Sequence, residues 1–152
     1  MSGETRHIRH VDHINFVGMA PDFQGIGYAH IQQNLPKVTD RLTWQSILKD
    51  DTLACVGYGP SLTKTYSFLS NYKHIMSMSG SHDFLIQRGI IPTYHVEGDP
   101  SEHNAVFTSK PHVGVNYLLA SSCHPKTIDQ LLEQHLTLWN LAPDQKFIYP
   151  AG

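Results

Sequence analysis

The sequence predicts an α/β fold built around a mostly parallel sheet. From Leu53 onward, short apolar segments alternate with helix-compatible segments of about ten residues, which is typical of βαβ units. The 152 residues suffice for one domain with a hydrophobic core. Small or polar residues follow four of the apolar segments. In a parallel sheet such turns meet at one edge, where ligands bind, so the pattern predicts a place for a site.

The predicted elements follow one another in chain order. We expect strands at 53–56, 74–79, 94–97, 115–120, 136–139 and 147–149, and helices at 43–49, 62–71, 81–88 and 125–134. Ser81 is the expected N-cap of the helix that begins there, and Gly89 its C-cap. Residues 1–33 show no hydrophobic period and contain several glycines and one proline. We therefore expect a loosely ordered N-terminal arm at 1–33 and one domain at 34–152.

Composition and charge exclude several classes of protein. The formal net charge of −2 gives no basic surface for nucleic acid. No apolar run approaches the roughly 20 residues of a membrane helix, and the N-terminus has no apolar secretory core. Cys55 lies in a predicted buried strand and Cys123 in a loop, so two free thiols in a cytoplasmic protein are expected. The oligomeric state stays open.

The segment Gly57–Ser61 carries the strongest functional signal. Gly57, Tyr58, Gly59, Pro60 and Ser61 stand between a predicted strand and a predicted helix. Such a turn lets backbone N–H groups approach a phosphate, and a helix start adds a favourable dipole. The segment lacks the lysine of a Walker A loop and the third glycine of a dinucleotide fingerprint. The structural alternative is a tight turn whose glycines adopt positive φ.

Two carboxylates follow the predicted strand 94–97. Glu97 and Asp99 are two residues apart, so both side chains can point the same way. Carboxylates beside a phosphate site suit Mg²⁺, which takes oxygen ligands and bridges phosphates. We expect Asp99, with Glu97, to hold the metal ion. In the alternative, Asp99 opens a turn before Pro100 and Glu97 is solvated.

Three further residues lie at predicted strand ends. Ser79 and Ser81 are candidate nucleotide contacts, although Ser81 first serves as a helix cap. His124 precedes Pro125 and is the candidate catalytic histidine, with Asp99 as the other catalytic residue. The eleven histidines are scattered, and none forms the His-x-x-x-His pair of a zinc protease, so a zinc site is not favoured. We expect His95 to pack within its strand.

Three blocks of sequence support a resemblance to a known family. They are Val56–Leu62, Gly89–Pro100 and Leu118–Pro125. In order and spacing, the chain resembles the 6-hydroxymethylpterin diphosphokinase MptE-like family from about Asn34 to Tyr149. The resemblance implies a Rossmann-like, three-layer domain. It also implies transfer of diphosphate from ATP to a hydroxymethylpterin with Mg²⁺, with Gly57–Ser61 at the nucleotide and Asp99 as the strand-end aspartate.

The resemblance leaves two other functions open. Related domains occur in motility accessory factors implicated in glycosylation, and the glycine turn is similar to the CMP-binding turn of bacterial sialyltransferases. The alternatives are therefore a glycosyltransferase using a CMP- or UDP-sugar and a non-catalytic nucleotide-binding module. Tyr58 stands where relatives often have a smaller or amide residue, and Ser79–Ser81 where many have an acidic or amide-bearing segment. Relatives usually continue beyond the equivalent of Tyr149, so the resemblance leaves open a domain truncated at its C-terminus, a fragment, or a minimal version of the domain.

Overall fold

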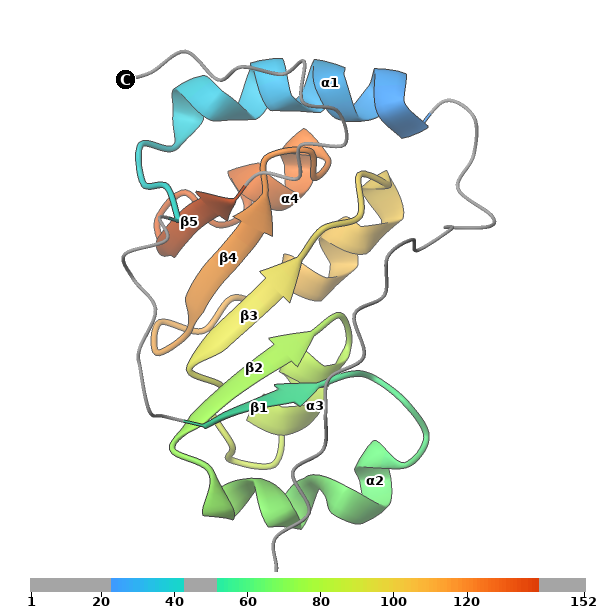
Figure 1. The fold of residues 1–152 in the computed structure, drawn as a ribbon, viewed down its shortest axis with the longest axis vertical. Coiled ribbons are helices and arrows are strands. Elements are labelled where there is room, and N and C mark those ends of the chain that lie inside the picture. Colours follow the sequence, from blue (N-terminus) through green and yellow to red (C-terminus); the bar gives the residue numbers. More distant parts are fainter. Residues whose placement is uncertain (1–22, 43–51, 140–152) are drawn as a thin grey trace, which may run out of the picture.

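The computed structural model describes residues 23–42 and 52–139. Its centre is a five-stranded sheet (Figure 1). The strands are β1 (Leu53–Val56), β2 (His74–Met78), β3 (Tyr94–Glu97), β4 (Asn116–Ala120) and β5 (His135–Trp139). They lie in sequential order, and every neighbouring pair is parallel. The predicted α/β class with a parallel sheet is therefore confirmed.

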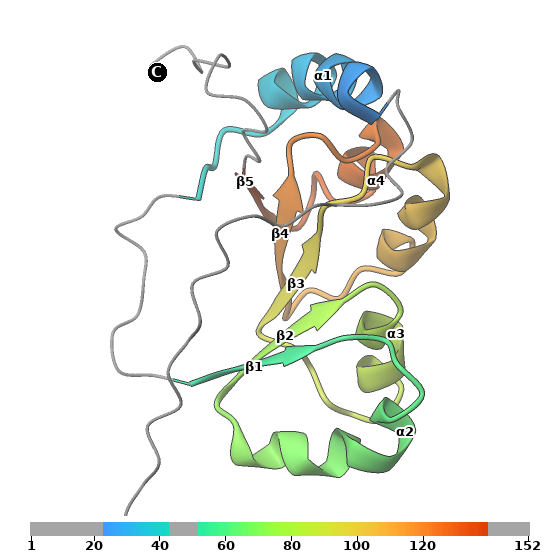
Figure 2. The same cartoon turned by 45° about the vertical axis from the view of Figure 1, so that its right-hand side comes forward.

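The connecting helices lie on one side of the sheet (Figure 2). They are α2 (Leu62–Thr65), η3 (Tyr66–Asn71), α3 (Ser81–Ile86), η4 (Glu102–Thr108) and α4 (Pro125–Asp129). Sequential parallel strands with right-handed crossovers put every connection on the same face, which explains this arrangement. The described residues therefore form the sheet and one helical layer, and the second helical layer of the predicted three-layer domain is not among them.

The core lies between the sheet and these helices. Alternate strand residues face the helices, which follows from the two-residue repeat of a strand. The larger of two apolar clusters gathers fully buried side chains of β4, β5, α4 and the turn after α4, among them Tyr117, Leu119, Leu138, Ile128 and Leu131. The second joins β1 and β2 to α2 and α3 through Val56, Leu62, Ile75, Phe84 and Leu85.

The N-terminal arm predicted at 1–33 is helical over its last part. Helix α1 (Phe23–Asn34) packs against α4 and is followed by the short 3₁₀ helix η1 (Leu35–Lys37). The fully buried Asn34 donates hydrogen bonds from Nδ2 to the carbonyls of Ser121 (3.0 Å) and Cys123 (2.8 Å). This stretch therefore belongs to the domain and is not loosely ordered. Residues 1–22 lie outside the described residues.

Other boundaries also differ from the prediction. Ser81 does not cap α3, because its hydroxyl donates to the carbonyls of Val56 (2.7 Å) and Met78 (2.8 Å) and accepts from the Met78 N–H (2.9 Å). Gly89 has a φ of 75° just beyond α3, as expected of a residue that ends a helix. Cys55 is exposed rather than buried. The helix predicted at 43–49 and the strand predicted at 147–149 lie outside the described residues.

Within 23–42 and 52–139, no helix is both long enough and apolar enough to cross a membrane.

Candidate functional site

The parallel sheet brings the predicted site segments to one edge. Gly57–Ser61 follows β1, Ser79–Ser81 follows β2, Glu97–Asp99 follows β3, and Ser121–His124 follows β4. Neighbouring strands lie about 4.8 Å apart, so the glycine turn is about 10 Å from the end of β3 and about 14 Å from that of β4. The first three segments are therefore close enough to serve one ligand, and His124 lies farther along the edge.

The glycine turn after β1 is open to solvent. Gly57 and Gly59 do not have positive φ, since among the described glycines only Gly89 has. A Cβ placed on Gly57 would meet nothing within 4 Å, and one on Gly59 would meet only the Ser61 hydroxyl at 3.9 Å. The turn is closed by one hydrogen bond, from the Leu62 N–H to the Gly59 carbonyl (3.0 Å). The structural alternative of glycines that adopt positive φ is therefore wrong for Gly57 and Gly59.

Tyr58 connects this turn to the next one along the edge. Its side chain is 63% exposed. A Cβ on Gly80 would lie 2.7 Å from Tyr58 Cδ1 and 2.8 Å from Cε1, so the ring rests directly on the Gly80 backbone. The Phe84 ring supports it edge-on at a centroid distance of 6.4 Å. The Tyr58 ring is thus held on one side while much of its surface remains open.

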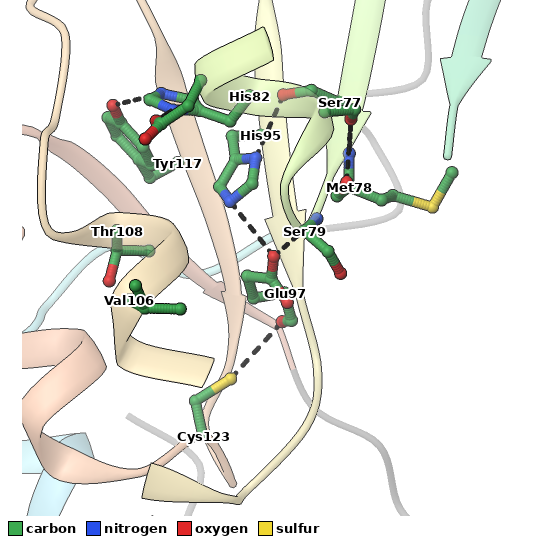
Figure 3. Close-up of polar contacts among 12 residues, drawn as sticks. Ser77, Met78, Ser79, His82, His95, Glu97, Val106, Thr108, Tyr117 and Cys123 are labelled. Atoms are coloured by element: carbon green, nitrogen blue, oxygen red, sulfur yellow. Dashed lines mark hydrogen bonds and ion pairs between the residues drawn. The ribbon is translucent and has the colours of Figure 1, made fainter. Parts of the chain in front are cut away.

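Glu97 is turned into the protein rather than toward solvent (Figure 3). Its Oε1 accepts a hydrogen bond from the Ser79 N–H (2.7 Å) and lies 3.2 Å from Nε2 of the fully buried His95. His95 in turn shares a hydrogen bond of 3.0 Å between its Nδ1 and the Ser77 hydroxyl. The alternative of a solvated Glu97 is therefore wrong, while the predicted packing of His95 within its strand is confirmed.

Asp99 remains at the surface, two residues beyond Glu97. Its Oδ1 accepts a hydrogen bond from the Ser101 N–H (2.8 Å), so it does open the turn at Pro100. Partial burial acts to raise the pKa of Asp99, but hydrogen bonds from Ser101 and Asn104 outweigh it and lower the pKa. Asp99 is therefore an ionised, exposed carboxylate at the site edge, and this environment fits a Mg²⁺ ligand shared with phosphate. Glu97 does not offer such a carboxylate.

A second buried group lies beneath the edge, and sequence reasoning missed it. His82, fully buried on α3, places Nδ1 2.7 Å from Asp83 Oδ1 and Nε2 3.0 Å from the Tyr117 hydroxyl (Figure 3). That hydroxyl also accepts from the His112 N–H (2.8 Å). Burial lowers the pKa of His82, so the ring is neutral at pH 7. It then donates from Nδ1 to Asp83 and accepts from Tyr117 at Nε2.

The contacts of His124 within the protein account for a histidine at this position without a ligand. Its Nδ1 accepts a hydrogen bond from the Lys126 N–H (3.2 Å), which caps α4. Its ring lies edge-on to that of His30 on α1, with centroids 5.0 Å apart. His30 is itself nearly buried and bonded to the Ser122 carbonyl (3.2 Å). These contacts assign His124 a structural role in the docking of α1, and they leave its predicted catalytic role a prediction.

An open cleft of about 610 Å³ lies between η4 and α4. None of the residues predicted for the site lines it, although η4 begins three residues after Asp99. Glu102 and Lys126, which both line the cleft, form an exposed ion pair (3.2 Å). The lining residues are Glu102, His103, Ala105, Val106, Ser109, Lys126 and Gln130. The cleft is large enough for a small organic molecule.

Comparison with known families assigns the chain to one of them. A sequence model of the 6-hydroxymethylpterin diphosphokinase MptE-like family matches residues 29–148, from within α1 to beyond β5. The chain belongs to this family. No curated protein and no solved structure is significantly similar to this MptE-like chain.

Family membership indicates a transferase-type function for the MptE-like domain. The open glycine turn and Asp99 lie within the matched residues. In the described part of the MptE-like domain, no group of three or more His, Cys, Asp and Glu side chains could hold a metal ion by itself. Any Mg²⁺ bound here would share its coordination shell with phosphate oxygens and water, as is usual for this ion.

Proposed function

We propose that this protein is a Mg²⁺-dependent transferase that moves a diphosphoryl group from ATP to a small hydroxyl acceptor, such as a hydroxymethylpterin. The observation that carries the proposal is the open glycine turn. Gly57 and Gly59 have neither a positive φ nor a neighbour that would exclude a side chain. The fold itself therefore does not require glycine at these positions, whereas close approach of a phosphate does.

We assign phosphate, metal and acceptor binding to different parts of the edge. Gly57–Ser61 would hold the phosphates through backbone N–H groups and the exposed Ser61 hydroxyl. Asp99 would hold Mg²⁺, which neutralises charge on the phosphates when bound. The acceptor would occupy the cleft that begins at Glu102, just beyond Asp99. About 10 Å separates the ends of β1 and β3, a gap that a triphosphate and its metal ion can bridge.

The reaction itself is a substitution at the β-phosphorus of ATP. The acceptor oxygen bonds to that phosphorus, the bond from it to the oxygen shared with the α-phosphorus breaks, and AMP leaves with that oxygen. The acceptor hydroxyl releases its proton to water. Catalysis then depends on alignment of the reactants and stabilisation of charge, for which the turn and Asp99 suffice.

A binding experiment with a matched pair of variants tests the proposal. Gly57→Ala adds a methyl group into open space, so we expect unchanged unfolding but at least ten-fold weaker binding of ATP with Mg²⁺ by calorimetry. Asp99→Asn should remove the Mg²⁺ dependence while leaving weak ATP binding. As control, Gly27→Ala changes a glycine of α1 that faces Ser122 and not the glycine turn, so this variant should bind normally.

The choice of nucleotide separates the candidate functions. Thermal-shift measurements with ATP, GTP, CTP, CMP and UDP, each with and without Mg²⁺, detect binding to the native state by mass action. A Mg²⁺-dependent shift with ATP supports the proposal and justifies assays with pterin acceptors. A shift with CMP alone contradicts it and favours a sugar-nucleotide donor. No shift with any nucleotide contradicts the assignment of the glycine turn as a nucleotide site.

A further inference from the structure

We infer that Tyr58 is a preformed stacking surface for a flat heterocyclic ring, and that Glu97 is the positioning residue that fixes it. The inference rests on the proposed function and deepens it by assigning the ligand class that this part of the edge selects. Tyr58 is 63% exposed, and it lies in the open turn at the carboxyl edge of the sheet. Aromatic rings held in this way bind flat π-systems by stacking.

The Tyr58 ring can pack on the backbone at position 80 because this residue is glycine. At this position the backbone has a φ of −60° and a ψ of −9°, which any residue can adopt. Glycine is required here for space, because a Cβ would lie 2.7 Å from the Tyr58 ring. The chain therefore brings the ring onto bare backbone, and Phe84 fixes its edge at 6.4 Å.

The position of Gly80 depends on the residue before it. Ser79 has a φ of 50°, a left-handed conformation that is uncommon for residues other than glycine. Its N–H donates to Glu97 Oε1 at 2.7 Å, and His95 Nε2 lies 3.2 Å from the same oxygen (Figure 3). Because Glu97 is only 6% exposed, its carboxylate is fixed in place and holds Ser79 in this conformation. Glu97 thus acts through Ser79 and Gly80 on Tyr58.

This arrangement selects a ring rather than a charge. The Tyr58 ring is neutral and offers its face to a base or a similar bicyclic heterocycle, while the phosphates bind at the adjacent glycines. Stacking of this kind tolerates different bases, because each has a π-face. The inference therefore assigns a class of ligand, a planar nitrogen heterocycle, to the Tyr58 side of the turn.

Calorimetry with two ligands tests the inference: ATP, which carries a ring, and inorganic tripolyphosphate, which does not, each with Mg²⁺. We expect Tyr58→Ala to weaken ATP binding by about five- to 150-fold and to leave tripolyphosphate binding unchanged. Tyr58→Phe keeps the ring and should bind ATP as the wild type does. Equal loss for both ligands, or no loss for ATP, would overturn the stacking role.

A second pair of variants tests the support. Gly80→Ala displaces the exposed ring without straining the backbone, so it should weaken ATP binding in the same selective way. It should cause no further loss in a Tyr58→Ala background, as a double-mutant cycle would show. Additive losses would mean that Gly80 acts by another route and would overturn this part of the inference.

The Glu97→Gln variant tests whether Glu97 is a positioning residue or a metal ligand. In Glu97→Gln the amide oxygen can still accept from the Ser79 N–H, so ATP affinity and its Mg²⁺ dependence should survive. Loss of the Mg²⁺ dependence in this variant would instead make Glu97 a metal ligand and refute the assignment. If wild-type protein binds neither ATP nor tripolyphosphate, the proposed function fails as well. If it binds both and Tyr58→Ala changes neither, only this inference fails.

Discussion

Removal of the Asn34 side chain should loosen the docking of α1 on the domain. Asn34 is fully buried, and its Nδ2 donates to the carbonyls of Ser121 (3.0 Å) and Cys123 (2.8 Å). These bonds connect α1 to the turn between β4 and α4, which are about ninety residues away in sequence. The substitution Asn34→Ala removes both donors and leaves both acceptors inside the protein.

The expected cost follows from these two bonds. A typical intramolecular hydrogen bond contributes about 0.5–1.5 kcal/mol net, so the pair contributes about 1–3 kcal/mol. Because two buried carbonyls lose their partner, we expect a loss near the upper end, about 3 kcal/mol in the free energy of unfolding. Asn34→Asp should cost more at neutral pH, because it places a buried carboxylate against the same carbonyl oxygens.

Urea unfolding followed by circular dichroism measures this loss. The slope of the free energy against urea concentration reports the surface exposed on unfolding, so it should fall if α1 detaches before the rest unfolds. Gln32→Ala is the matched control, since Gln32 is exposed on the same helix and should change stability by less than about 0.5 kcal/mol. If Asn34→Ala costs no more than this control, the described docking of α1 is refuted.

Two further measurements address buried groups. Ellman's reagent should titrate one thiol in the native protein, the exposed Cys55, and two after denaturation, because burial raises the pKa of Cys123 to about 12. Two fast-reacting native thiols would contradict this. Burial also lowers the pKa of His82 and His30. The unfolded state then binds more protons as the pH falls through 6.5. The stability contributed by each histidine should therefore be present well above that pH and decrease below it, by at most about 1.4 kcal/mol per pH unit, until the lowered native pKa is reached. A melting temperature that does not change between pH 7 and pH 5 would refute it.

The strands could be predicted because their residues repeat a simple pattern. Each described strand is a short segment that contains apolar residues and is bounded by Gly, Pro or polar residues, and this pattern predicts all five. The edge position of the glycine turn and of Asp99 follows directly, since parallel strands point their carboxyl ends the same way. The strand order does not follow from the pattern. The placement of the helices on one face depends on that order, so the pattern does not predict it either.

Helix α1 could not be found by the same signal. It meets the domain through Gly27, whose added Cβ would lie 3.6 Å from Ser122, and through the polar side chains of His30 and Asn34. Ile31 is the large apolar side chain that α1 buries beside them. One such residue among a glycine and polar side chains makes no continuous apolar stripe, and hydrophobic periodicity is what sequence reasoning detects. Within α1, Gly27 is a contact residue and Gly25 an exposed helix position, so neither marks a loose arm.

The burial of Glu97 follows from its two-residue spacing from His95, whereas its spacing from Asp99 indicates only a shared direction. Side chains two apart in a strand share a face, and His95 was already expected to pack inside. That relation places Glu97 on the helix-facing side of β3, where the structure finds it, and the chain turns outward only after Gly98. The alternation within the strand was therefore the available signal, and it favoured a buried carboxylate.

The buried polar groups beneath the edge form a connected set that stability alone does not require. Ser77, His95 and Glu97 bring hydrogen-bonding groups and a carboxylate to positions where apolar side chains would normally be as stable or more so. The set ends on the N–H of Ser79, the residue whose left-handed backbone leads into the Gly80 turn beneath Tyr58. A buried network that ends at a strained residue of an exposed edge has a geometric effect there, because it fixes one conformation of the turn. The polar core of this domain and its proposed ligand site are thus two ends of one structural element.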